Sequence, residues 1–200
     1  MNQDELIEIF LEASKLMIKE EDRCGNLIYP KDQNGEIKVR EPQLKHAITT
    51  VLTDRGINFG IEMRTAETYR ISGEKPDRGN TDLVIYSGNE IVNVELKADQ
   101  PAMGEIAKDF KKMLGENVAG VAFFNVLKSK NKETLPGLLK KYQMAYEQEK
   151  KSSSTKPGKW FLLFIFVREK RKYSFGQFTD IGGLSGEEFV GMADTLKDLP

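Results

Sequence analysis

The chain has a single cysteine, Cys24, and a single histidine. One cysteine excludes an intrachain disulfide framework, and so few Cys and His residues exclude a zinc site built from them. The sequence also lacks any apolar run of the roughly 18 residues that a membrane-spanning helix needs, and its first residues are acidic where a signal peptide would be positively charged. We therefore expect a cytoplasmic protein that does not interact with a membrane.

Neither sign of charge dominates, because 30 Lys and Arg residues face 31 Asp and Glu residues, for a formal net charge of −1. A whole-molecule field that would attract nucleic acid is therefore excluded, and any such binding must depend on a local patch. With 200 residues, of which 39% are hydrophobic, the chain can bury one sizeable core. We expect a single domain over residues 1–200.

The centre of the chain predicts a β-hairpin. Two runs rich in β-branched and aliphatic residues, 81–87 and 90–97, are separated only by a Gly-Asn pair, which is the composition of a tight two-residue hairpin loop. If the residues that flank this loop face each other, the register of the whole hairpin is fixed. That register places Asp82 directly opposite Glu95.

The two faces of this hairpin differ in polarity, because strand side chains alternate with period two. One face is apolar and consists of Leu83, Ile85, Val92, Val94 and Leu96. The other face carries Asp82, Glu95 and Lys97. Two carboxylates directly opposite each other repel, so we expect positive charge between them. Either Lys97 or a divalent cation held by oxygen ligands would supply it.

Asp82 followed by Glu95-Leu96-Lys97 resembles the motif of the PD-(D/E)xK nuclease superfamily, whose fold is called restriction-endonuclease-like. The proline that usually precedes the Asp is absent here. The elements predicted over 41–126 occur in the order helix, three strands, helix, strand, which is the common core of that superfamily. The resemblance implies a three-layer α/β/α fold (αβββαβ) with a mixed central sheet.

Hydrophobic periodicity and turn residues give the full order of elements. The core, 41–126, is expected to contain a helix beginning at Glu41 and Pro42, a strand over 57–65, the hairpin, a helix over 102–116 and a strand over 118–126. A helix over 5–19 and a small hairpin over 26–39 form an N-terminal elaboration, 1–40. The C-terminal accessory part, 127–200, is expected to add a helix over 135–150, a hairpin over 160–178 and a terminal helix over 186–199.

Two residues are candidates for a third acid in the site. Glu41 lies at the start of the inward face of its helix, where it either complements the helix dipole or joins the site. The resemblance implies the second role, because many members of the superfamily carry a Glu on the helix before the sheet. Glu62 lies on the strand beside the hairpin and is the other candidate.

The resemblance implies a metal-dependent endonuclease that hydrolyses phosphodiester bonds, most of all in DNA. Asp82, Glu95 and the main-chain carbonyl of Leu96 would then bind Mg²⁺ or Mn²⁺. Lys97 would orient the attacking water or stabilise the transition state, and Glu41 would complete the catalytic set. Two alternatives stay open. One is an inactive relative that acts as a nucleic-acid-binding or protein-interaction module, and the other is an unrelated α/β protein with an exposed Glu95–Lys97 ion pair.

Candidate phosphate contacts lie on the segments that flank the hairpin. They are Lys75 and Arg78 in the preceding loop, and Lys108 and Lys111, with Lys112, on the expected exposed face of the following helix. The densest positive cluster is a turn near the C-terminus that contains Arg168, Lys170, Arg171 and Lys172. Each set is also typical of a solvated surface. The expected partner is nucleic acid, and cutting of both strands with one site per chain favours a homodimer.

Overall fold

The computed structural model describes residues 1–24, 40–68, 78–128, 134–152 and 158–200. The small hairpin predicted over 26–39, the candidate contact Lys75 and part of the loop before the central hairpin lie outside these ranges. In the described part of the chain, no helix is long and apolar enough to cross a membrane.

Within the described ranges, one mixed sheet of seven strands runs through the molecule, with the strands side by side in chain order. The strands are β1 (Asn58–Arg64), β2 (Asn80–Ser87), β3 (Glu90–Ala98), β4 (Gly120–Leu127), β5 (Trp160–Val167), β6 (Lys172–Phe178) and β7 (Lys197–Asp198). β3, β4 and β5 are parallel to one another, whereas all other neighbours are antiparallel. The parallel strands are the most completely buried, as expected for strands covered on both faces.

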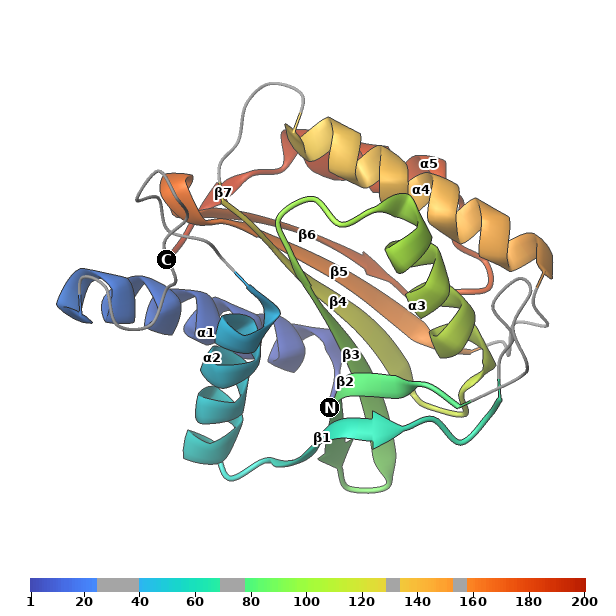
Figure 1. The fold of residues 1–200 in the computed structure, drawn as a ribbon, viewed down its shortest axis with the longest axis horizontal. Coiled ribbons are helices and arrows are strands. Elements are labelled where there is room, and N and C mark those ends of the chain that lie inside the picture. Colours follow the sequence, from blue (N-terminus) through green and yellow to red (C-terminus); the bar gives the residue numbers. More distant parts are fainter. Residues whose placement is uncertain (25–39, 69–77, 129–133, 153–157) are drawn as a thin grey trace.

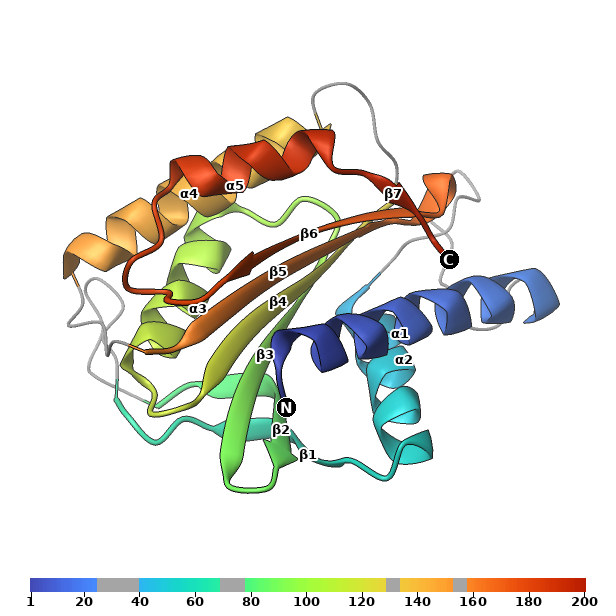
Figure 2. The same cartoon turned by 180° about the vertical axis from the view of Figure 1, so that it is seen from behind.

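Helices cover both faces of this sheet, as Figures 1 and 2 show. On one face lie α1 (Gln3–Cys24) and α2 (Glu41–Asp54), which share a core with the apolar side of the central hairpin. On the other face lie α3 (Met103–Gly115), α4 (Thr134–Ser152) and the short α5 (Glu187–Val190), which form a second core. The predicted three-layer α/β/α fold with a mixed sheet is therefore confirmed.

The central hairpin has the register that its loop predicts. Ser87 pairs with Glu90 and Leu83 with Val94, and Gly88 takes a positive φ of 58° in the loop. The apolar side chains of β2 and β3 accordingly face α1 and α2. The polar side chains must therefore face α3 and α4.

The C-terminal segment differs from its prediction. Where one helix was expected over 186–199, the structure has α5, a 3₁₀ turn at Gly191–Asp194 and the strand β7. Gly191 follows the last residue of α5, and glycine is a poor helix former. The open edge of β6 then offers main-chain partners, so Tyr173 pairs with Lys197 in the sheet.

Candidate active site

Asp82 lies where the two strands of the central hairpin stop pairing. The ladder between β2 and β3 runs as far as Leu83 and Val94. Just beyond this pair, Oδ2 of the half-buried Asp82 accepts a hydrogen bond of 2.8 Å from the main-chain N–H of Leu96. Asp82 and Glu95 thus stand at the end of the ladder, and the Asp82 side chain takes up a main-chain donor there.

Glu95 is buried on the α3 side of the sheet, with 2% of its surface exposed. The Lys112 ammonium lies 2.5 Å from its Oε1, although that oxygen accepts no hydrogen bond of ordinary geometry within the described residues. Lys112 also donates to the main-chain oxygen of Asn80 at 2.8 Å and to Oδ1 of Asp109 at 3.3 Å. The prediction that Lys112 is exposed is therefore wrong.

Lys97 is also buried and is held from α3 and α2. Its Nζ lies 2.8 Å from Oδ2 of Asp109 and 3.7 Å from Oε1 of Glu41. Glu41 thus reaches the end of β3 from the first turn of α2, which contains Pro42 as predicted. Glu62, the other candidate for a third acid, is exposed and pairs with Lys45 of α2 at 2.8 Å.

Six side chains form what we call the charged cluster: Glu41, Asp82, Glu95, Lys97, Asp109 and Lys112. Its four carboxyl groups face two ammonium groups, so full ionisation would leave two negative charges unbalanced. Glu95 and Lys97 do not form the exposed ion pair of an unrelated α/β protein, because both are buried and each has a different partner on α3.

The imbalance of charge shifts the protonation of the cluster. Burial, followed by repulsion from Asp109 and Asp82, raises the pKa of Glu95 well above its usual range, and Lys112 only partly opposes this. Burial likewise raises the pKa of Glu41. Burial would lower the pKa of Lys97, but the attraction of nearby carboxylates outweighs it and raises that pKa. The two lysines therefore stay charged, whereas burial and the acidic neighbours favour the protonated form of Glu95 and the Lys112 ammonium favours its ionised form.

The donor set suits a hard divalent cation by its chemistry. Asp82 and Glu95 offer carboxylate oxygens, and full ionisation of the cluster would leave two negative charges, which one such ion balances. Among the described residues, no three Asp, Glu, His or Cys side chains converge as a ready-made metal cage. Mg²⁺ does not require one, because it is commonly bound by one or two carboxylates together with waters and substrate phosphates.

A second layer of buried polar groups lies beside Lys97. Asn125 of β4 is its partner in the parallel ladder and is fully buried. The Asn125 amide donates to the main-chain oxygen of Asp99 at 3.0 Å and accepts a hydrogen bond of 3.0 Å from the Tyr142 hydroxyl. These contacts tie the end of β3 to β4 and α4.

Sequence reasoning missed Asp109, Lys112 and Asn125. Asp109 and Lys112 are three positions apart in α3, so they share one border of its apolar stripe. Asn125 is a single amide within a nearly continuous apolar strand. A polar residue in such a run needs a buried hydrogen-bond partner. This requirement is the sequence feature that could have identified Asn125.

The phosphate-contact candidates that the structure describes lie on, or directly before, elements that carry the cluster. Arg78 is exposed just before β2, and Lys108 is exposed on α3, where Lys111 is half-buried. The basic turn follows β5, and β5 runs in the same direction as β3. The turn therefore lies at the same end of the sheet as the C-terminal end of β3. Within this turn Arg168 is buried, and Lys172 pairs with Asp198 at 3.1 Å.

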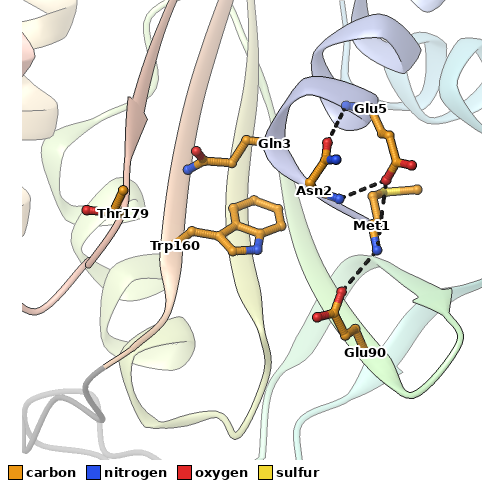
Figure 3. Close-up of a pocket in the computed structure, with 7 residues that line it drawn as sticks. All are labelled: Met1, Asn2, Gln3, Glu5, Glu90, Trp160 and Thr179. Atoms are coloured by element: carbon orange, nitrogen blue, oxygen red, sulfur yellow. Dashed lines mark hydrogen bonds and ion pairs between the residues drawn. The ribbon is translucent and has the colours of Figure 1, made fainter.

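A cavity of about 610 Å³ lies at the opposite end of β3 and does not include the cluster. Figure 3 shows its lining side chains, among them Gln3, Trp160 and Thr179. The amino group of Met1 is bound there to Glu90 at 3.0 Å. The candidate site is therefore the charged cluster at the other end of β3.

Comparisons with family models, with curated proteins and with solved structures find no match to this chain. The function must be inferred from the geometry of the cluster itself.

Proposed function

We propose that this protein is a Mg²⁺- or Mn²⁺-dependent endonuclease of the PD-(D/E)xK type that hydrolyses phosphodiester bonds in DNA. One observation carries the proposal. The hairpin brings Asp82, Glu95 and Lys97 to one end of β3, where an excess of carboxylate over ammonium is buried. A protein gains little stability from such a cluster, whereas a cation-binding catalytic site requires one.

The carboxylates of Asp82 and Glu95 are the groups that would hold the metal, next to the main chain of Leu96. When bound, the metal would lower the pKa of a coordinated water and neutralise charge on the scissile phosphate. The site needs Glu95 to be ionised, so binding of the metal must compete with the proton that this residue tends to retain.

Lys97 would act as a fixed positive charge. Asp109 and Glu41 hold its ammonium from two sides and keep it protonated. A positioned ammonium can orient a water molecule or stabilise the charge that develops on a phosphate oxygen. Glu41 is half exposed, so it lies at the entrance of the site and would position Lys97.

DNA would approach the end of the sheet that contains the C-terminal ends of β3 and β5. The basic turn after β5 lies at this end, and the exposed Arg78 and Lys108 belong to the segments that carry the cluster. These contacts are to phosphates and imply affinity without sequence preference, and a strong dependence on salt concentration.

The second candidate function is that of an inactive nucleic-acid-binding or protein-interaction module with this fold. The contact between Lys112 and Glu95 favours it, because an internal ammonium already lies where a metal ligand is needed. The two functions differ in whether the protein cleaves DNA when the metal is present.

Cleavage of plasmid DNA by the purified chain, with Mg²⁺ or Mn²⁺ and with a chelator, tests the proposal. Asp82→Asn and Glu95→Gln each keep the size of the side chain and should lower the cleavage rate by about 10³-fold or more, or roughly 4 kcal/mol of transition-state stabilisation. Glu62→Gln is the matched control, because this acid on the neighbouring strand is exposed and bound to Lys45.

Metal-independent cleavage, or full activity in either cluster variant, would overturn the nuclease assignment. DNA binding that is retained without any cleavage by the wild-type protein would instead establish the inactive module.

A further inference from the structure

Lys112 is the residue of the charged cluster that a metal site does not need. It comes from α3, one turn before the end of the helix, and only 6% of its surface is exposed. Its Nζ contacts Glu95, the most deeply buried of the carboxylates, at 2.5 Å. The Lys112 ammonium therefore lies where it can neutralise Glu95, a proposed metal ligand.

Among the residues that the structure describes, the contact with Glu95 is one of three that Lys112 makes. The other two are to the main-chain oxygen of Asn80 and to Oδ1 of Asp109. Neither of these groups is a proposed metal ligand. Lys112 can consequently give up Glu95 and still keep an acceptor and a counter-ion within the site.

Asp109 is placed to hold both lysines. Its Oδ2 lies 2.8 Å from Lys97 and its Oδ1 lies 3.3 Å from Lys112, so each carboxylate oxygen serves one ammonium. If Glu95 turned to a metal ion, Asp109 would retain both positive charges near the substrate. The exchange would move an ammonium by a short distance and would not expel it into solvent.

We propose that Lys112 is a built-in counter-ion for Glu95 that a divalent cation displaces, so that Lys112 sets the metal affinity of the site. The inference rests on the proposed function only in taking Asp82 and Glu95 as the metal ligands. In the metal-free protein Lys112 limits the repulsion among the carboxylates. The displaced ammonium then faces the space in which a phosphate would lie, where it adds a second positive charge beside Lys97.

Titration calorimetry of the full chain with Mn²⁺ tests this exchange. Lys112→Met removes the competing ammonium and keeps an unbranched apolar side chain, so the dissociation constant for Mn²⁺ should fall by about tenfold or more. Lys111→Met is the matched control, since this neighbouring lysine is half-buried and is not part of the cluster. Its affinity should equal that of the wild type. The titrations belong at mildly alkaline pH, where protons compete less for Glu95.

A measurement on the wild-type protein covers the case in which Lys112→Met does not fold. The ¹⁵Nζ resonances of buried lysine ammonium groups report on their partners, and Lys112→Arg assigns the signal. Saturation with Mg²⁺ should shift the Lys112 resonance in the wild type and leave it in place in the Asp82→Asn variant.

Each outcome bears on the exchange separately from the nuclease function. Tighter Mn²⁺ binding by Lys112→Met, or a shifted Lys112 resonance, supports the exchange even if no DNA is cleaved. Equal or weaker binding with an unshifted resonance overturns it even if cleavage is metal-dependent. A chain that binds no Mn²⁺ with or without Lys112 overturns both proposals.

Discussion

The two faces of β3 are buried to nearly the same degree and are chemically opposite. Val94 and Leu96 face α1 and α2 and are 0% exposed, whereas Glu95 and Lys97 face α3 and are 2% and 8% exposed. Burying an aliphatic side chain contributes about 1.5 to 3 kcal/mol to stability. Burying an ion pair contributes little or nothing once desolvation is counted.

This difference separates the part of β3 that supports the fold from the part for which we propose a function. The apolar face belongs to a continuous core with the helices above it. On the charged face, four carboxyl groups lie against two ammonium groups. Stability alone does not explain such a face, which supports a role in binding a cation.

The largest effect is expected from breaking the pair of Lys97 and Asp109. Lys97→Met or Asp109→Leu leaves the partner buried with only its longer contact, to Lys112 for Asp109 and to Glu41 for Lys97, which should lower the free energy of unfolding by about 4 kcal/mol. The double variant replaces the pair by apolar groups and should lose much less than either single variant. Urea denaturation of the four proteins gives the coupling free energy. If the double variant lost the sum of the two single losses in free energy of unfolding, the buried pair would not be coupled. The contrast drawn between the two faces of β3 would then be refuted.

A somewhat smaller loss is expected on the apolar face. Leu96→Ala removes a fully buried side chain and leaves a cavity, which should lower the free energy of unfolding by about 3 kcal/mol. No second substitution on the cluster should rescue it, because the loss arises from packing. Since the Leu96 side chain points away from the cluster, Mn²⁺ affinity should stay unchanged in calorimetry, and a change would mean that the two faces are coupled.

The smallest effect is the pH dependence of the metal-free protein. The pKa of Glu95 is raised above its usual value of 4.5, so the folded state holds this proton more tightly than the unfolded state does. The resulting stabilisation is complete below that pH and is lost as the pH rises through the folded pKa.

The difference between wild type and Glu95→Gln isolates this contribution. In chelator, the wild type should lose stability relative to the variant as the pH rises from about 5 to about 6, by at most about 1.4 kcal/mol. Urea titrations at several pH values measure the slope. Parallel curves would show that folding leaves the pKa of Glu95 unchanged.

The sequence predicts the hairpin more completely than the rest of the site. A two-residue loop and a period of two are local properties, and together they determine that Leu83 faces Val94 and that Glu95 shares a face with Lys97. The approach of Glu41 does not follow from a local pattern, because an acid at the first turn of a helix also suits the helix dipole, and only the resemblance favours its role in the site.

The environment of Lys112 depends on tertiary packing and could not be predicted in this way. Lys108 and Lys112 are one turn apart on α3, and both lie beside the apolar stripe that Phe110 and Met113 define. Which of them meets the acids depends on how the helix is rotated and translated over the sheet. Helical periodicity identifies a stripe, but it does not specify which of its borders faces β3.

The position of α3 is in turn fixed from far along the chain. The ammonium of Lys159, just before β5, donates to the main-chain oxygens of Met113, Leu114 and Glu116 at the end of the helix, across separations of 43 to 46 residues. During synthesis a nascent chain that has emerged only through α4 contains every residue of the charged cluster and lacks this cap. A cluster formed at that stage would therefore rest on an α3 whose last main-chain oxygens have not yet met the Lys159 ammonium.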